Sequence, residues 1–304
     1  MSGTKRVVIV GSLNYDVLLK QSRLPQRGET LTCQEALAAG GGKGANQAVQ
    51  AAKMGMETYL LGAVGQDAIG DFLLQTCAKY GVQTTFVHRC ACSTGLGMVQ
   101  YMPDGSVFAT IAEGANKMVT PELIMKANKC LVDADAIMLQ FEIPTESVAF
   151  VLHYARQRKI PTMLNVSPAK AEGRDLLKET SCLILNEQEA SFYSGACINS
   201  FDSICKHMQV LRALCGNRII ITLGAQGSAL IEKDDAFYIP PSANVNVVET
   251  TGAGDSYAGT YVARRLMGDT PVTACQYATL AAEYTISQVG AQSAMPTWKE
   301  IKGA

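Results

Sequence analysis

Residues 7–11 read Val-Val-Ile-Val-Gly, a short apolar run without polar alternation that ends at a glycine. Runs of this kind are typical of strands buried on both faces of a parallel sheet, and the glycine permits a tight loop after the strand. Five further apolar runs predict more buried strands, at 58–63, 136–139, 162–165, 182–185 and 218–222.

Segments with helical periodicity alternate with these strands. They cover 45–54, 69–80, 145–158, 203–214, 255–266 and 273–288. The alternation predicts an α/β fold, a doubly wound and mainly parallel sheet with helices on both faces. The chain has 304 residues without a linker or an internal repeat, so we expect one domain that spans 1–304.

Two segments, 12–40 and 84–112, break this rhythm with shorter and more alternating stretches. The turn chemistry of Pro103-Asp104-Gly105-Ser106 is typical of a hairpin. An isolated hairpin is marginal in water, so we expect the two to pair into one small antiparallel β sheet. Such a sheet would project from the main domain as a lid or a subunit contact.

Composition argues against several classes of partner. The 26 Lys+Arg and 27 Asp+Glu residues give a net charge of −1, which supplies no field to hold nucleic acid or an anionic membrane. The apolar runs are far shorter than the ~20 residues of a membrane-spanning helix. Ten cysteines without a recognisable export signal indicate reduced thiols, so we expect a cytoplasmic protein.

The strongest local signal for chemistry is Glu249-Thr250-Thr251-Gly252-Ala253-Gly254-Asp255-Ser256. Its three small residues at a predicted helix start leave backbone N–H groups uncovered, and with the helix dipole these form an anion site. Asp255 follows directly and could accept a proton from a hydroxyl that attacks phosphorus. The alternative is an ordinary helix start, in which Asp255 only stabilises the dipole.

A second glycine-rich stretch, Gly40-Gly41-Gly42-Lys43-Gly44-Ala45-Asn46-Gln47, precedes another predicted helix. It is not a Walker A loop, because Lys43 is followed by glycine where Ser or Thr would bind Mg²⁺. It contains the loose G-x-G-x-x-A pattern, but the segment before it is a poor buried strand, which disfavours a dinucleotide site. Lys43 and Asn46 at a helix entry suit a small polyhydroxylated ligand.

Nine motifs in order resemble the ribokinase/pfkB family of sugar kinases. They are Gly11-Ser12-Leu13-Asn14-Tyr15-Asp16, Gly41-Gly42-Lys43-Gly44-Ala45-Asn46-Gln47-Ala48-Val49, Asp67-Ala68-Ile69-Gly70, Ser93-Thr94-Gly95, Gly114-Ala115-Asn116, Gln140-Phe141-Glu142, Asn186-Glu187-Gln188-Glu189, Thr222-Leu223-Gly224 with Gly227, and Thr250-Thr251-Gly252-Ala253-Gly254-Asp255. Together they are far more specific than any one glycine loop. The resemblance implies a ribokinase-like fold and ATP-dependent phosphorylation of the 5-hydroxyl of D-ribose.

On this resemblance, Asp255 is the catalytic base, and the amides of Gly252, Ala253 and Gly254 hold the transferring phosphoryl group. The family's sugar-binding positions are matched by Asn14, Asp16, Gly42, Lys43, Asn46, Glu142 and Asp255. These residue types fit a sugar, since Asp and Glu accept hydrogen bonds from hydroxyl groups while Asn and Lys donate.

The family's ATP-binding positions are matched by Asn186, Glu189, Thr222, Gly224, Gly227 and Gly254. Asn186 and Glu189 correspond to the pair near Mg²⁺ and the phosphates. An activating K⁺ would be held by Glu249, Thr251, Thr285, Gln288 and Gly290. The family usually has Asp at the position of Glu249, and Ala294 lacks a hydroxyl that many relatives provide. The longer carboxylate can still reach the ion, so we expect K⁺ activation at an altered affinity.

The two hairpins correspond to the family's lid, which closes over ribose and builds a homodimer. Two other functions stay open: a sibling kinase for 2-deoxyribose, fructose, pseudouridine or another nucleoside, and a sugar-binding regulator without catalysis. Asn14 and Asp16 favour a ligand with vicinal hydroxyls, hence ribose over 2-deoxyribose. The presence of Asp255 together with Gly252 and Gly254 argues against the regulator.

Overall fold

The computed structural model describes residues 4–103, 107–242 and 245–303. Its large sheet has nine strands in the order β13-β12-β11-β10-β9-β8-β1-β4-β5. In chain order these strands are β1 (Arg6–Val10), β4 (Glu57–Gly65), β5 (Val87–Cys90), β8 (Ala136–Gln140), β9 (Thr162–Asn165), β10 (Cys182–Asn186), β11 (Arg218–Thr222), β12 (Ser228–Glu232) and β13 (Asp235–Ile239). Every neighbouring pair from β5 to β11 is parallel, while β12 and β13 extend one edge in antiparallel fashion.

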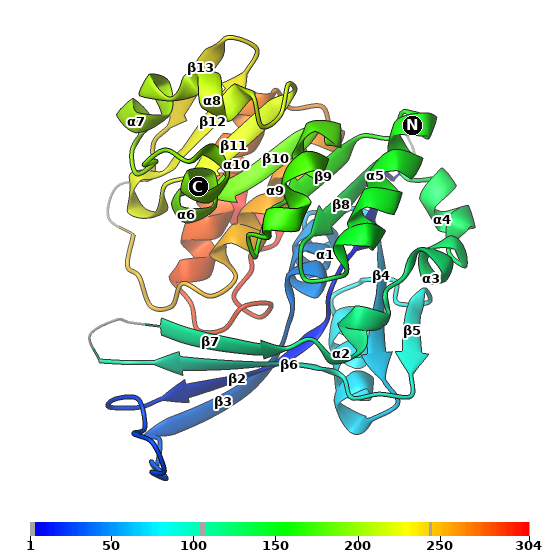
Figure 1. Cartoon of the computed structure of the whole chain (residues 1–304), viewed down its shortest axis with the longest axis vertical. Helices are drawn as coiled ribbons and strands as arrows, with labels where there is room; N and C mark the ends of the chain where they lie inside the picture. The colour runs from blue at the N-terminus through cyan, green and yellow to red at the C-terminus, as the bar shows by residue number, and fades with distance from the viewer. Residues whose placement is uncertain (1–3, 104–106, 243–244, 304) are drawn as a thin grey trace.

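Helices cover both faces of this sheet (Figure 1). One face carries α1 (Lys43–Lys53), α2 (Ala68–Lys79), α9 (Ala253–Leu266), α10 (Pro271–Ile286) and α11 (Trp298–Ile301). The other carries α3 (Pro121–Met125), α4 (Asn128–Val132), α5 (Thr145–Arg158), α6 (Glu187–Ser194), α7 (Phe201–Lys206) and α8 (Met208–Arg212). Successive residues of a strand pack into the cores on opposite faces of the sheet. Val7 and Ile9 lie in one core and Val8 and Val10 in the other. The doubly wound architecture expected from the sequence is confirmed.

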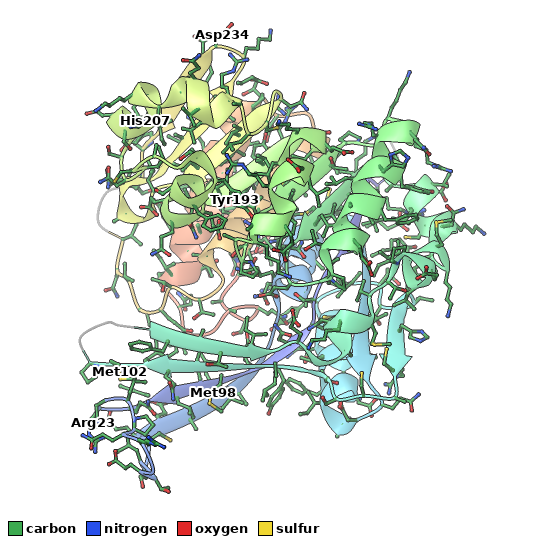
Figure 2. The ribbon with its side chains drawn as sticks, viewed as in Figure 1. Arg23, Met98, Met102, Tyr193, His207 and Asp234 are labelled. Atoms are coloured by element: carbon green, nitrogen blue, oxygen red, sulfur yellow. The ribbon has the colours of Figure 1, made fainter. Side chains whose placement is uncertain are left out.

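All six strands and all six helical segments expected from the sequence are present, with ends that differ by a few residues. The segment 203–214 departs most, because it is two helices that meet at His207 (Figure 2). A capping box between Ser200 and Ser203 starts α7 early, and the N–H of His207 is shared between the carbonyls of Ser203 and Ile204. The described residues also include three 3₁₀ helices: η1 (Gly114–Met118), η2 (Ala171–Glu179) and η3 (Gly224–Gln226).

A smaller sheet projects from the body with the order β3-β2-β6-β7 (Figure 1). Its strands are β2 (Asn14–Lys20), β3 (Glu35–Gly41), β6 (Gly95–Tyr101) and β7 (Val107–Ala112). The two hairpins are antiparallel as expected, and a parallel pairing of β2 with β6 joins them. The expected boundary at residue 84 is too early, because β5 pairs with β4 in the large sheet. We call this four-stranded sheet the lid; residues 104–106 of the expected turn lie outside the described residues.

The root of the lid is fixed by Asp67 and Thr94. Asp67 caps α2 by accepting the N–H of Gly70 at 2.7 Å, and its two carboxylate oxygens also accept the hydroxyl and N–H of Thr94. Thr94 in turn accepts the N–H of Gly65 at the end of β4. Two of the matched motifs therefore meet where the lid leaves the body.

Helices α1 and α9, which carry much of the site below, touch at Gly259. A Cβ at this position would lie 2.7 Å from Gln50 Cβ and 2.9 Å from the carbonyl oxygen of Gln47. We expect Gly259→Ala to lower the free energy of unfolding by about 1–3 kcal/mol, because the helices must move apart. Urea denaturation measures this change. The control is Gly254→Ala on the same helix, where a Cβ meets nothing within 4 Å, and equal losses in both variants would contradict the packing argument.

Candidate active site

The candidate site lies at the carboxyl ends of β1 and β8. The chain proceeds from β1 to β4 and β5 on one side, and from β8 to β11 on the other, so the strand order reverses between these two strands. Ligands of open α/β sheets bind in the crevice at such a reversal. Ser12 follows β1 and Glu142 follows β8. The hydroxyl of Ser12 donates to Glu142 Oε2 at 2.5 Å.

Asp255 reaches this crevice from the first turn of α9. Gly252 precedes the helix with a φ of +81°, a conformation that favours glycine, and Gly254 is exposed with open space around it. The carboxylate of Asp255 is buried and accepts hydrogen bonds from Asn46 Nδ2 at 2.9 Å and from Gln47 Nε2 at 3.0 Å. A simple capping role would require hydrogen bonds from Asp255 to the start of its own helix. Its hydrogen bonds go to α1 instead.

Lys43, the first residue of α1, supplies positive charge to the crevice. Burial opposes the charge on its ammonium group, but the carboxylates of Asp255, Glu142, Glu189 and Asp16 raise its pKa above the usual value. The backbone N–H of Lys43 also donates to Glu142 Oε2 at 3.0 Å. The structure thus brings together four acidic residues that stand far apart in the sequence.

The carboxylate of Asp16 on β2 lies between two glycines of neighbouring lid strands. A Cβ at Gly41 would lie 1.8 Å from Asp16 Oδ2, and one at Gly97 would lie 2.2 Å from Oδ1, so only glycine leaves room for this carboxylate. Burial, followed by the charges of Glu142 and Asp255, raises the pKa of Asp16 to about 7 against the opposing effect of Lys43.

Asn14 has a defined orientation because Asn116 is fixed by the backbone. The N–H of Leu13 donates to Asn116 Oδ1 at 2.9 Å, so Asn116 Nδ2 must be the donor to Asn14 Oδ1, at 2.8 Å. The amide nitrogen of Asn14 is then turned away from Asn116 and can donate elsewhere. Gly95 permits this pair, since a Cβ there would lie 2.4 Å from both amides.

Asn14, Asn116 and Glu142 line a cavity of about 290 Å³ between the lid and the body. Ile111 of β7 and Lys170 close its rim. Gly42 has a φ of +86°, and a Cβ there would lie 2.7 Å from the N–H nitrogen of Asn14, which explains how the start of α1 approaches the lid so closely. Of the predicted sugar-binding residues, Asn14 and Glu142 line this cavity, and the others adjoin it through Gly42 and Lys43 at the start of α1.

The expected ATP-binding residues lie at the ends of β10 and β11. Asn186 and Glu189 form a reciprocal capping box on α6, with distances of 2.8 and 2.9 Å, and Glu189 is near enough to influence Lys43. Thr222 ends β11, and Gly224 and Gly227 follow with φ values of +52° and +84°. A Cβ at Gly227 would lie 2.3 Å from the carbonyl oxygen of Ile239.

The residues expected to hold K⁺ fall on two adjacent loops. The N–H groups of Val248 and Glu249 donate to the carbonyl of Ile286, and Gly290 donates its N–H to Glu249 Oε2 at 2.8 Å. Thr285 lies in the last turn of α10 with its hydroxyl bonded to Ser256 Oγ, and Gln288 follows the helix with an exposed side chain. The two loops meet, and the carboxylate of Glu249 lies at their junction.

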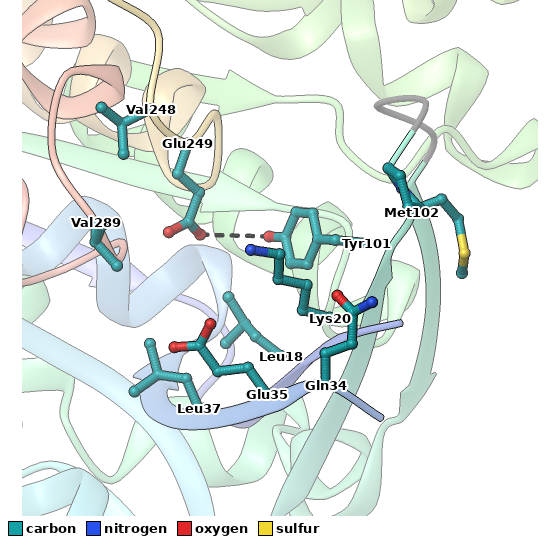
Figure 3. A pocket seen from close by; sticks show the side chains of 11 residues that line it. Leu18, Lys20, Gln34, Glu35, Leu37, Tyr101, Met102, Val248, Glu249 and Val289 are labelled. Carbon is teal, nitrogen blue, oxygen red and sulfur yellow. Dashed lines mark hydrogen bonds between the residues drawn. The ribbon is translucent and has the colours of Figure 1, made fainter. Parts of the chain in front are cut away.

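The lid touches these loops through Tyr101 (Figure 3). Its hydroxyl lies 2.5 Å from Thr251 Oγ1 and donates to Glu249 Oε1 at 3.3 Å. The contact spans a groove of about 510 Å³, lined by Leu18 and Leu37 of the lid and by Val289 of the body. The tip of the lid is therefore hydrogen-bonded to the loop that precedes the anion site.

Several functional candidates were missed by sequence reasoning. Gln47, Gln140 and Asn116 stood inside matched motifs, but as buried amides they gave no separate signal. Ser12 was a similar case, and Tyr101 carried no signal because its partners are remote in sequence. Within the described part of the chain, no group of three or more His, Cys, Asp or Glu side chains is arranged to hold a metal ion.

Two further observations concern membrane-spanning helices and the state of the cysteines. No helix within residues 4–103, 107–242 and 245–303 has the length and apolar character needed to cross a membrane. All ten cysteines carry free thiols.

Comparisons with known proteins agree with this geometry. The family described as pfkB family carbohydrate kinase matches residues 4–298. The ribokinase of Staphylococcus aureus (strain COL) is 32% identical over 301 residues, 98% of this chain and 99% of the relative, and the deoxyribokinase of Salmonella typhi is 30% identical over 97% of each chain. The solved structure of Arabidopsis thaliana ribokinase complexed with ribose and ATP superposes with a TM-score of 0.89 at 29% identity, over 99% of this chain and 98% of that one. This chain belongs to the pfkB family of carbohydrate kinases.

Proposed function

We propose that this kinase transfers the γ-phosphoryl group of ATP to the 5-hydroxyl of D-ribose, giving D-ribose 5-phosphate and ADP. The observation that carries the proposal is the single crevice in which Asp255, at the open start of α9, faces Asp16, Lys43 and Glu142. The similarity to ribokinases, one of them solved in complex with ribose and ATP, supports this choice of substrates.

In the proposed reaction Asp255 accepts the proton of the attacking hydroxyl. The N–H groups of Gly252, Ala253 and Gly254 would stabilise the charge that develops on the transferred phosphoryl group, because they lie at a helix start that is open beside Gly254. The N–H of Ala253 also has a long hydrogen bond, of 3.3 Å, to the carbonyl of Thr250. Lys43 offsets negative charge beside the reacting groups.

The donor sets fit the expected ions. Mg²⁺ takes oxygen ligands, often one carboxylate with waters and phosphate oxygens, and Glu189 offers a carboxylate beside Lys43. When bound with ATP, Mg²⁺ would neutralise phosphate charge. Glu249 accepts two hydrogen bonds, which leaves free lone pairs for a monovalent cation between its two loops. We infer that Glu249, Thr251, Thr285, Gln288 and Gly290 hold an activating K⁺.

Ribose is favoured over 2-deoxyribose by the polar groups of the lid. Asn14 presents a free amide nitrogen and Asp16 a carboxylate, a pair suited to neighbouring hydroxyl groups. A sugar without the 2-hydroxyl would leave either the buried Asn14 or the half-buried Asp16 without a partner, which is costly. The deoxyribokinase relatives keep 2-deoxyribose as the second candidate, ahead of fructose and pseudouridine.

We also infer the setting in which the protein acts. Residues 1–304 would form one domain with the lid as an extension, and the free thiols favour the reducing environment of the cytoplasm. The lid would join two chains into a homodimer, because Met98 and Phe108 are large exposed apolar side chains on the lid face that does not line the cavities towards the body. Met98 is visible on the lid in Figure 2.

The first test is an ADP-release assay of the wild type and Asp255→Asn with MgATP, across ribose, 2-deoxyribose, fructose and adenosine, with and without K⁺. We expect turnover to be selective for ribose, stimulated by K⁺, and reduced about 10²- to 10⁴-fold in Asp255→Asn because the base is lost. A kcat/KM for 2-deoxyribose equal to that for ribose would overturn the assigned sugar.

The matched control is Asp269→Asn, just beyond the other end of α9, where the carboxylate accepts a hydrogen bond from Arg264. This variant should turn over ribose at the wild-type rate. Ribose binding without turnover of any tested sugar in the wild type would instead support the non-catalytic regulator.

The second test uses the pH dependence of sugar recognition. Because the pKa of Asp16 is about 7, its carboxylate loses charge as the pH falls through neutrality, and kcat/KM for ribose should fall with it. The stability of the fold changes in the opposite direction. Because the pKa of Asp16 is raised, its ionisation lowers the free energy of unfolding increasingly as the pH rises from about 4 to 7. Asp16→Asn should therefore melt above the wild type at pH 8, by a margin that shrinks towards pH 5, while binding ribose poorly throughout. A flat stability difference between these pH values would contradict the raised pKa.

The third test concerns the lid as an interface. Sedimentation velocity of the wild type should give the mass of a dimer, and Met98→Lys should shift the equilibrium towards monomer, because a charge is placed in an apolar contact. Met267→Lys is the control, since Met267 is similarly exposed but lies at the end of α9, away from the lid. A wild-type monomer at micromolar concentration would refute the dimer.

A further inference from the structure

The proposed base accepts a hydrogen bond from a buried amide that is not one of the proposed sugar ligands. Gln47 is fully buried on α1, and its Nε2 donates to Asp255 Oδ1 at 3.0 Å. Asn46, the other donor to Asp255, is a proposed sugar ligand, whereas Gln47 is not among the proposed ligands. The contact between Gln47 and Asp255 joins residues 208 positions apart in the sequence.

The orientation of Gln47 follows from its partners. An ionised carboxylate only accepts hydrogen bonds, so the Nε2 of Gln47 must face Asp255 and its Oε1 must face away. That Oε1 accepts a hydrogen bond from Gln140 Nε2 at 2.7 Å. Gln140 ends β8 and is fully buried, so the carboxyl end of a central strand fixes the orientation of the amide that meets the base.

The backbone leaves room for this arrangement. A Cβ at Gly11 would lie 2.1 Å from Gln140 Oε1, so a larger residue after β1 would displace Gln140. Gln47 Nε2 also lies 3.3 Å from Asn165 Oδ1 at the end of β9. The amides therefore tie the first turns of α1 and α9 to the ends of two central strands.

We infer that Gln47 is a positioning residue for Asp255, with Gln140 fixing its amide; the inference rests on the proposed function. A buried carboxylate keeps its charge only where donors replace lost water, and hydrogen bonds to a charged group are stronger than neutral ones. Gln47 supplies one such donor from α1. It thereby fixes the direction of the Asp255 carboxylate, which accepts the proton of the attacking hydroxyl in the proposed reaction.

The test is Gln47→Met, which keeps the unbranched shape and removes the amide. We expect kcat to fall about 10-fold or more, a fraction of the 10²- to 10⁴-fold that a general base contributes. KM for ribose and the calorimetric affinity for ADP should change less than about 3-fold, because the amide acts only through the base. The acid side of the kcat–pH profile should move to higher pH, since the ionised base has lost a donor.

The matched control is Gln50→Met, one turn further along α1. Gln50 is also fully buried, and its Nε2 donates at 2.8 Å to Thr260 on α9 instead of to Asp255. This variant should lose stability as Gln47→Met does but keep the wild-type kcat and pH profile. Equal kcat losses in the two variants, or a wild-type kcat and profile in Gln47→Met, would overturn the inference.

Gln140→Met provides the second route if Gln47→Met does not fold. It leaves Gln47 in place but frees its amide to rotate, so a smaller loss of kcat with the same direction of pH shift is expected, and a wild-type profile would overturn the inference. Asp255→Asn distinguishes a failure of the proposed function from a failure of the role assigned to Gln47. Full activity in Asp255→Asn would refute the proposed function itself, whereas an inactive Asp255→Asn beside a wild-type-like Gln47→Met would refute only the role of Gln47.

Discussion

The Lys43 ammonium lies among four carboxylates, and the arrangement of the crevice depends on that balance of charge. Acidic groups crowded into a half-buried space favour protonation, as the raised pKa of Asp16 demonstrates even with Lys43 opposing it. Lys43 acts through both of its ends, because its backbone N–H holds Glu142 while its side chain offsets the acidic charges. It can do so because Gly42 takes a positive φ and brings the start of α1 against the strand that carries Asn14.

Most of the large sheet could be predicted from the sequence, because apolar runs such as 7–10 and 182–185 can only be buried strands at this length. The parallel pairing of β2 with β6 could not, since hairpin turns fix local pairs and say nothing about which strands of two hairpins meet. Glycine-rich motifs located the residues around Asp255 and Lys43. The contacts of Gln47, Gln140 and Tyr101 escaped prediction because each joins residues more than 90 positions apart, and neither periodicity nor spacing records such contacts.

The lid and the body are joined at both ends of the site. At the root, Asp67 and Thr94 bind the first residues of β6 to the start of α2 and the end of β4, with short bonds between largely fixed groups. Towards the tip, the contact is made by the hydroxyl of Tyr101 on the lid, which meets a body loop that also carries proposed cation ligands. A stiff root with a lighter tip contact favours hinge motion in which the outer lid leaves the body while Asn14 and Asp16, near the root, move least. The proposed sugar ligands on the lid can therefore stay ordered while the entrance opens.

This division also bears on how sugar specificity arises. A ribokinase and a deoxyribokinase match this chain at 32% and 30% identity over nearly its whole length, so overall similarity cannot select the substrate. In the proposed reaction the base, its buried amides and the open helix start belong to the body and would act on the transferred group and the attacking hydroxyl, which both sugars share. The 2-hydroxyl is the difference between the two sugars, and the groups suited to neighbouring hydroxyls are Asn14 and Asp16 on the lid. On the proposed assignment, selection between these sugars would depend on the fixed orientation of Asn14 by Asn116 and on the charge of Asp16, two properties set by burial and by hydrogen bonds rather than by the identity of the catalytic motif.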